Sequence, residues 1–247
     1  MPQANVYDVD VASIAALIGD PARCAMLNAL LGGGALPAGE LARLAGISPA
    51  TATGHLHKLV DGGLVQVVAQ GRHRYHRLSG PHVASALEAL AILAPAVPVR
   101  SLRQSRTASA LAEARTCYDH LAGRLGVAVA TTLLERKALE PTDERDHRLT
   151  AAGRELLAQL GIEAEGLGHG RRAFARFCLD WTERRPHLAG ELPAQLLSMM
   201  LRDGWFRRDA AGRALQVTEK GTKALSATLG LDVADEGNHG RPEPLER

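Results

Sequence analysis

The chain has 247 residues, of which 46% are hydrophobic and 23% are charged, and its 29 Lys and Arg against 27 Asp and Glu leave a net charge of +2. That length allows two domains with separate cores, and the small net charge means that affinity for nucleic acid would come from local clusters, with no non-specific polyanion binding implied. Three cysteines exclude a fully paired disulfide framework, and because no apolar run approaches the roughly 18 residues of a membrane span, we predict a cytoplasmic protein with no membrane partner.

The first predicted elements are two short helices. Val9 to Ile18 is rich in apolar residues. Asp20 is a good N-cap and Pro21 fits the first helical position, so a second helix is expected to begin there. The core stripe of this helix consists of Met26, Leu27, Leu30 and Leu31.

The next stretch predicts a helix-turn-helix. Glu40 to Ala45 has apolar residues at helical spacing, and Gly46 supplies the positive φ that a tight turn needs. Ser48 is a good N-cap for a second helix, whose inward stripe starts at Ala52. The opposite face carries small, polar or basic side chains, which allow close approach to base edges and phosphates. These side chains belong to Ala50, Thr51, Thr53, Gly54, His57 and Lys58.

A basic β-hairpin is predicted to follow. Leu64 to Val68 is rich in β-branched residues and favours a strand. The turn is expected at Gln70 to Arg72, and the return strand at His73 to Leu78. Cations cluster at the tip, where a wing would lie against the phosphate backbone.

The segment from Val11 to about Ala94 resembles the ArsR/SmtB-type winged helix-turn-helix repressors. The resemblance is carried by ALIGDPARCAMLNALL in the opening helices, ELARLAGISPATATGHLHKLVDGGLV in the reading unit and GRHRYHRL in the wing. It implies a homodimeric repressor that binds an inverted repeat in double-stranded DNA and responds to an effector. It also implies that the major groove is contacted by Ser48, Ala50, Thr51, Thr53, Gly54, His57 and Lys58, and that the wing is formed by Arg72, His73 and Arg74.

The resemblance further implies that the helix from His82 to Leu93 makes the dimer interface together with the first helix. Two metal sites of the family have no counterpart in the sequence. Glu40 to Ala45 has no Cys-x-Cys pair, and the His82 helix lacks the paired Asp, His and Glu ligands. If the protein senses an effector, the sensing site must therefore lie elsewhere.

A Pro-rich linker, Ala94 to Pro98, marks the predicted domain boundary. Beyond it ARTCYD (114–119) recurs as ARFCLD (175–180), and HLAG (120–123) recurs as HLAG (187–190). Such an ordered recurrence indicates an internal repeat. The predicted organisation is a DNA-binding and dimerisation domain at 9–94, a linker at 95–100, a sensor domain at 101–232 built from repeats 101–165 and 166–232, and a disordered tail at 233–247.

The predicted fold is therefore mostly α with small β-hairpins: a winged helix-turn-helix followed by two degenerate winged-helix-like units, each read as helix, helix, hairpin and closing helix. Packing of the two repeats about a pseudo-twofold axis would bring equivalent residues together. The residues expected to converge are Cys117 with Cys178, His120 with His187, and Asp119 with Asp180.

Cys117, Cys178, His120 and His187 make a candidate site for Zn or another transition metal, with Asp119 and Asp180 as further candidate ligands. Three alternatives stay open. The repeated residues are packing positions, or the thiols form a redox switch in which Arg115 or Arg176 lowers a thiol pKa, or the unit binds an organic ligand. Five aromatic residues suit such an apolar pocket: Phe174, Phe177, Trp181, Trp205 and Phe206.

The functional prediction is an effector-responsive transcriptional regulator that is not an enzyme. The rival hypothesis is a thiol-dependent enzyme fused to a DNA-binding domain, with Cys117 or Cys178 as nucleophile and a His as base. A third hypothesis is a DNA-packaging protein, which would bind with little sequence preference and a steep salt dependence.

Overall fold

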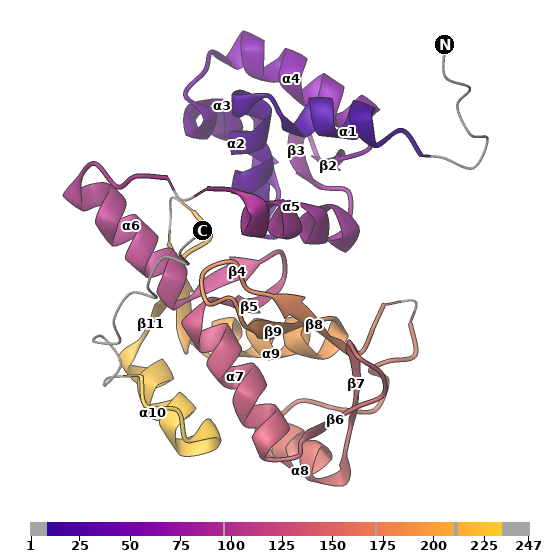
Figure 1. Cartoon of the computed structure of the whole chain (residues 1–247), viewed down its shortest axis with the longest axis vertical. Helices are drawn as coiled ribbons and strands as arrows, with labels where there is room; N and C mark the ends of the chain where they lie inside the picture. The colour runs from indigo at the N-terminus through magenta and orange to yellow at the C-terminus, as the bar shows by residue number, and fades with distance from the viewer. Residues whose placement is uncertain (1–8, 96, 171, 210–211, 234–247) are drawn as a thin grey trace, which may run out of the picture. The chain divides into compact units, whose positions relative to one another are not determined.

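The computed structural model describes residues 9–95, 97–170, 172–209 and 212–233. The chain divides into two compact units, one ending before Val97 and one beginning there; Thr116–Tyr118, within a hairpin of the second part of the chain, are grouped with the first unit. Helices and small antiparallel sheets make up both units (Figure 1), which confirms the predicted fold class. Among the described residues, no helix combines the length and apolar character needed to cross a bilayer.

The first unit is a winged helix-turn-helix with an added short strand. Its three-stranded sheet has the order β1-β3-β2, and β1, which the sequence did not suggest, pairs Leu36 with His76. The elements are α1 (Val11–Ile18), α2 (Pro21–Leu30), β1 (Leu36–Pro37), α3 (Ala38–Ala45), α4 (Pro49–Asp61), β2 (Val65–Gln70), β3 (His73–Leu78) and α5 (Pro81–Leu93).

Local signals account for where these helices begin and end. Asp20 accepts a hydrogen bond from the Arg23 N–H at the start of α2, and Ser48 accepts one from the Thr51 N–H at the start of α4. Gly46 ends α3 with φ of 67°. The apolar stripes of α2, α3 and α4 then share one core with β2, β3 and α5.

The second unit holds the remaining strands in three antiparallel sheets: β4-β5, β10-β11 and the four-stranded β6-β7-β8-β9. The order strand, strand, helix, strand, strand, helix occurs twice after α6, although a duplication as its origin stays a prediction. The elements are α6 (Leu102–Glu113), β4 (Arg115–Cys117), β5 (His120–Ala122), α7 (Arg124–Glu135), β6 (Leu139–Pro141), β7 (Asp146–Leu149), α8 (Ala151–Gln159), β8 (Ala175–Leu179), β9 (Pro186–Ala189), α9 (Glu191–Arg202), β10 (Phe206–Arg208), β11 (Leu215–Val217) and α10 (Glu219–Leu229).

The prediction that each repeat consists of helix, helix, hairpin and closing helix is wrong in one respect. The two Cys-containing segments are strands, β4 and β8, each followed by a second strand. The helices α7 and α9 begin only after Gly123 and Gly190, which have φ of 81° and 123°. A Cβ on either glycine would lie 2.7 Å from a backbone carbonyl oxygen, so the chain makes a close turn there that a continuous helix would not allow.

The two halves of the second unit pack in a crossed manner. Helix α7 of the first half packs on β9 of the second, and α9 packs on β5. One core cluster spans both halves, with Leu125 and Leu133 from α7 beside Leu192 and Leu197 from α9. This crossing brings β5 and β9 next to each other. The predicted domain boundaries stay predictions, and residues 234–247 of the predicted tail lie outside the described residues.

Candidate functional site

The candidate DNA-reading surface is the outward face of α4. Its inward residues Ala52, Leu56 and Leu59 are buried in the core of the first unit, which fixes the orientation of the helix. The seven residues expected to face the major groove are all exposed: Ser48, Ala50, Thr51, Thr53, Gly54, His57 and Lys58. Of these, Thr53 returns its hydroxyl to the Pro49 carbonyl, which leaves its methyl group outward. The members of this set up to Gly54 have small side chains, and the larger His57 and Lys58 follow toward the C-terminal end of the helix.

The candidate wing is the β2–β3 hairpin. Its register pairs Gln70 with His73, so the turn lies at Gly71 and Arg72, as the sequence predicted. Arg72, His73 and Arg74 are exposed at the tip. The base of the same hairpin is anchored, since His76 and Leu78 are buried. The hairpin therefore presents its cationic tip from a base that is fixed in the core.

The candidate effector site is a cluster of Cys117, His120, Cys178 and His187, whose ligand atoms all lie within 4.8 Å of one another. Its residues come from two hairpins. Cys178 and His187 are direct cross-strand partners on β8 and β9, while Cys117 ends β4 and His120 begins β5, which pairs with β4. The Nε2 atoms of His120 and His187 are 3.2 Å apart. The structure thus brings together the four residues that the sequence repeat nominated.

Asp119 and Asp180 lie at the other ring nitrogen of each histidine. The Nδ1 atom of His120 is 3.3 Å from Asp119 Oδ1, and that of His187 is 3.4 Å from Asp180 Oδ2. Neither carboxylate belongs to the four-residue group that could hold an ion. Both carboxylates contact the outer side of the imidazoles, and their role as direct ligands stays a prediction.

Each of these carboxylates is in turn bound by an arginine. Arg172 donates two hydrogen bonds to Asp119, at 2.7 and 2.8 Å. Arg115 donates to Asp180 at 2.9 Å, and both of these side chains are fully buried. The site consequently contains two Arg–Asp–His chains that meet where the histidines face each other.

Asp180 also anchors the surrounding backbone. It accepts hydrogen bonds from the N–H groups of Gly123, Thr182 and Glu183 and from the Thr182 hydroxyl. Burial alone would raise the pKa of this carboxyl, but the charge of Arg115 and these hydrogen bonds hold the pKa well below its usual range. Asp180 is therefore a charged residue in the interior, with its charge matched by Arg115.

The electrostatics of His120 reflect the same arrangement. Burial lowers the pKa of His120, while Asp119 and Cys178 raise it, and the net pKa lies above the ordinary value. The pKa of Asp119 lies below its ordinary value, because His120 and Arg172 outweigh the effect of burial. A positive charge between these groups is therefore stabilised.

Both arginines considered as activators of a thiol are paired with carboxylates. Arg115 binds Asp180, and Arg176 binds Asp146 at 3.0 Å. The redox hypothesis expected one of these arginines to lower the pKa of a thiol, and both arginines instead bind a carboxylate. The sequence did not indicate the partner of Asp119, because Arg172 lies outside both repeated motifs.

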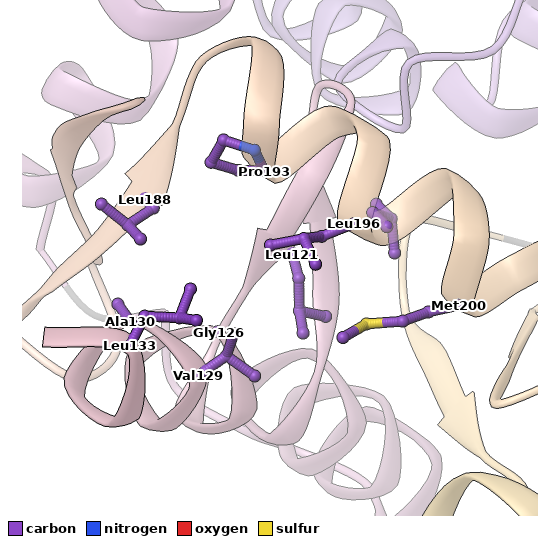
Figure 2. Close-up of a pocket in the computed structure, with 10 residues that line it drawn as sticks. Leu121, Gly126, Val129, Ala130, Leu133, Leu188, Pro193, Leu196 and Met200 are labelled. Atoms are coloured by element: carbon purple, nitrogen blue, oxygen red, sulfur yellow. The ribbon is translucent and has the colours of Figure 1, made fainter. Parts of the chain in front are cut away.

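A pocket next to the crossed helices is lined by aliphatic residues. Figure 2 shows Leu121 of β5, Val129 of α7, Leu188 of β9 and Met200 of α9 pointing into it. None of the five predicted aromatic residues lines this pocket.

The prediction of an aromatic ligand pocket is therefore not realised in this cavity. Trp205 and Phe206 belong to the core itself, and Phe174 and Phe177 pack against it. Trp181 lies under the Arg115 guanidinium, 4.7 Å from its carbon. The aromatic residues gather in one stretch of sequence because they build the core and its rim.

Comparison with known proteins identifies the family. A family model described as a helix-turn-helix domain matches residues 18–68. The uncharacterized HTH-type transcriptional regulator YdfF of Bacillus subtilis (strain 168) is 42% identical over 224 residues, which cover 91% of this chain and 99% of that protein. The chain belongs to the HTH-type transcriptional regulators. Because the match spans nearly all of YdfF, this regulator and YdfF share the C-terminal unit as well as the reading unit.

Solved structures give shorter matches. The homodimeric winged helix-turn-helix DNA-binding domain of Mb0332 from Mycobacterium bovis, described as a possible ArsR-family transcriptional regulator, is 28% identical, with a TM-score of 0.31 and coverage of 34% of this chain and 76% of that one. The cadmium metal-sensor CMTR from Mycobacterium tuberculosis is 33% identical, with a TM-score of 0.31 and coverage of 37% and 94%. The predicted helix-turn-helix regulator of transcription is confirmed by the family model and by the match to YdfF.

Proposed function

We propose that this HTH-type regulator is a homodimeric, cytoplasmic repressor that binds an inverted repeat through α4 and the β2–β3 wing. The observation that carries the proposal is the uncluttered outer face of α4, held outward by three buried residues on its other side. The small and hydroxyl side chains there allow the backbone of α4 to come close to the base edges. Lys58 and the cations of the wing would contact phosphates.

Dimerisation would cover two apolar helices. None of the residues of α1 is buried, and Val11 and Ile14 are 66% and 36% exposed. On α5, Leu90 and Leu93 are also exposed, at 45% and 81%. Helices this apolar are stabilised when a partner covers them. A twofold-symmetric dimer would then place two reading helices at half-sites about one helical turn apart.

We assign sensing to the C-terminal unit, with a metal ion as the effector. Of the alternatives considered, the metal is favoured by the convergence of two thiols and two imidazoles from separate hairpins. Binding there would shift the population between placements of the two reading helices, and so alter the fit to DNA. A catalytic role for Cys117 is not favoured, because its side chain is buried.

The proposed function is tested by selecting bound fragments from a random duplex library with the full-length protein, at two salt concentrations. The expected result is an enriched inverted repeat. Equal binding to all sequences with a steep salt dependence would instead assign a DNA-packaging role.

Variants of the selected complex identify the contacts. Thr51→Ala and Thr53→Ala are each expected to cost about 1–3 kcal/mol of binding, with relaxed specificity at one base pair. Lys58→Ala is expected to weaken binding to all sequences alike and to lower the salt slope by about one. Lys220→Ala, an exposed lysine of α10, is the matched control and should leave binding unchanged. Wild-type affinity in all three reading-helix variants would overturn the assignment of α4.

A further inference from the structure

The two facing histidines pose a chemical problem that the rest of the cluster answers. A neutral imidazole carries one N–H, and a carboxylate accepts but does not donate. If Nδ1 of His120 and Nδ1 of His187 each direct their hydrogen toward Asp119 and Asp180, both Nε2 atoms carry lone pairs. Those lone pairs face each other at 3.2 Å in the interior. A cation between the two nitrogens would stabilise such an arrangement.

The distance between the nitrogens matches two ligands of one tetrahedral ion. A Zn–N bond of about 2.05 Å and a tetrahedral angle place two ligating nitrogens about 3.3 Å apart. The His120 and His187 Nε2 atoms are 3.2 Å apart. With Zn–S bonds of about 2.3 Å, two ligating sulfurs lie about 3.8 Å apart. All four candidate ligand atoms lie within 4.8 Å of one another, so small movements would bring them to these separations.

The charges also balance. A divalent ion bound by two thiolates and two neutral imidazoles has no net charge, as an interior site requires. The two outer carboxylates are already matched by Arg172 and Arg115. Binding would therefore release about two protons from the ligand set and leave no unpaired charge among these groups.

We infer that Cys117, His120, Cys178 and His187 form a closed tetrahedral site for Zn(II) or another thiophilic ion of its class, and that Asp119 and Asp180 are positioning residues that orient the two imidazoles. Four protein ligands leave no open position for water or substrate, which is the pattern of structural and regulatory zinc rather than catalytic zinc. The ion class and coordination of the site follow from its geometry. Only its role in sensing rests on the proposed function.

The site joins two hairpins that are separated along the chain. His120 and His187 are 67 residues apart, and so the ion would cross-link the two halves of the C-terminal unit. The Arg115 guanidinium connects the same site to the end of α6 by donating to the Leu111 carbonyl. Helix α6 begins at Leu102, just after the predicted linker at 95–100.

The first test is a titration of the reduced, metal-free, full-length protein with Co(II), followed by displacement with Zn(II). The expected result is one Co(II) per chain with the intense visible bands of tetrahedral cobalt and thiolate-to-cobalt charge-transfer bands, displaced by one Zn(II). Zn(II) binding to the metal-free protein is expected to release about two protons near neutral pH. Weak octahedral bands, or no binding, by the wild-type protein would overturn the inference.

Cysteine variants locate the ion. Cys178→Ser is expected to abolish the tetrahedral bands or to weaken binding by more than a hundredfold. Cys24→Ser removes the third cysteine, which lies in α2, and is expected to leave stoichiometry and spectrum unchanged. Circular dichroism confirms that both variants are folded. Tetrahedral binding that persists in a folded Cys178→Ser protein would overturn the ligand assignment.

The role of the outer carboxylates is tested at Asp119, which is partly exposed and so tolerates substitution better than the buried Asp180. Asp119→Asn is expected to lower Zn(II) affinity 10- to 100-fold with the tetrahedral cobalt spectrum retained. Asp146→Asn is the matched control, because Asp146 forms a similar ion pair with Arg176. Its Zn(II) affinity should equal that of the wild type. Equal affinity in Asp119→Asn as well would refute the positioning role.

Two further outcomes separate this inference from the proposed function. Sequence-specific DNA binding without any bound metal, accompanied by a Cys117–Cys178 disulfide on mild oxidation, would overturn the metal site and leave the regulator intact. A tetrahedral Co(II) site whose loading does not change operator affinity would support the metal site and refute metal as the effector.

Discussion

The two units differ in how far apart along the chain the residues lie whose polar contacts fix the local structure. In the reading unit the capping contacts join residues three apart, as in Asp20 with Arg23 and Ser48 with Thr51. In the C-terminal unit the decisive polar contacts join residues 65 apart in Arg115–Asp180 and 53 apart in Arg172–Asp119. The reading unit is therefore specified by local signals, and the C-terminal unit by pairings that form only when its two halves meet.

This difference sets what each unit can do. A helix held by its own cap and one buried stripe can present an invariant outer face, which suits the recognition of a regular duplex. A site assembled from two hairpins depends on how those hairpins are joined, which suits a response to a ligand that bridges them. Variants that should affect one unit and spare the other test this difference.

The largest effect is expected from Arg115→Ala. This substitution leaves the Asp180 charge buried without its partner, which costs about 3–5 kcal/mol of unfolding free energy. Arg176→Ala is the control at the equivalent position of the other repeat. Its ion pair with Asp146 is 43% and 35% exposed, so the loss should be about 0–1 kcal/mol.

The measurement is urea unfolding followed by tryptophan fluorescence. Both tryptophans, Trp181 and Trp205, lie in the C-terminal unit, so this signal reports on that unit alone. Because Trp181 contacts Arg115, midpoints and slopes are compared rather than amplitudes. Similar losses for the two arginines would refute the claim that burial of the Arg115–Asp180 pair organises the unit.

A second large effect is expected from Gly221→Ala in α10. An added Cβ would lie 2.0 Å from the Trp205 carbonyl oxygen, so backbone must shift at a cost of about 1–3 kcal/mol or more. Lys220→Ala, on the exposed neighbouring residue, should stay within about 0.5 kcal/mol of the wild type. Fluorescence-detected unfolding gives both values, and an unchanged Gly221→Ala midpoint would contradict the close packing of α10 on the backbone of Trp205.

Local and long-range specification also explain what could be predicted from the sequence. Ser48, Gly46 and the β-branched run at β2 each predict an element from a few neighbouring residues, and the structure has those elements. The strands β4 and β8 were not predicted. Strand β4 is only three residues long, and part of the pairing of β8 is with β7, where Asp146 lies opposite Arg176, 30 residues away along the chain. The convergence of the cysteines and histidines was nevertheless predictable. Two similar repeats that pack on each other bring equivalent residues together, and the repeat is visible in the sequence.

The positions of Asp119 and Asp180 could not be predicted in the same way. Repetition indicated that they come near the cluster, and it did not indicate which ring nitrogen they would face or which arginine would bind them. Arg115 is inside the repeated motif and Arg172 is outside it. Only the folded geometry shows which imidazole each carboxylate contacts and which arginine binds it.

A smaller effect is expected at the cap of the reading helix. Ser48→Ala removes the acceptor of the Thr51 N–H and should cost about 0.5–2 kcal/mol, seen as faster hydrogen exchange in the first turns of α4. Ser48→Asp restores an N-cap acceptor and adds a negative charge. We expect it to recover the exchange protection and to weaken DNA binding. Normal operator binding by Ser48→Asp would place the start of α4 away from the phosphates.

The smallest effect on stability, and the sharpest contrast with Gly221, is expected at Gly54. This glycine lies inside α4, is exposed, and has no atom near the position of an added Cβ. Because glycine in a helix interior is destabilising, Gly54→Ala should raise the unfolding free energy by about 0.5–1 kcal/mol, measured by hydrogen exchange along α4. No packing contact then explains the glycine. Under the proposed function the backbone at Gly54 lies close to DNA, so the more stable variant should bind the selected operator more weakly. A variant that gains stability and keeps full affinity would show that the backbone of α4 does not approach the duplex at Gly54.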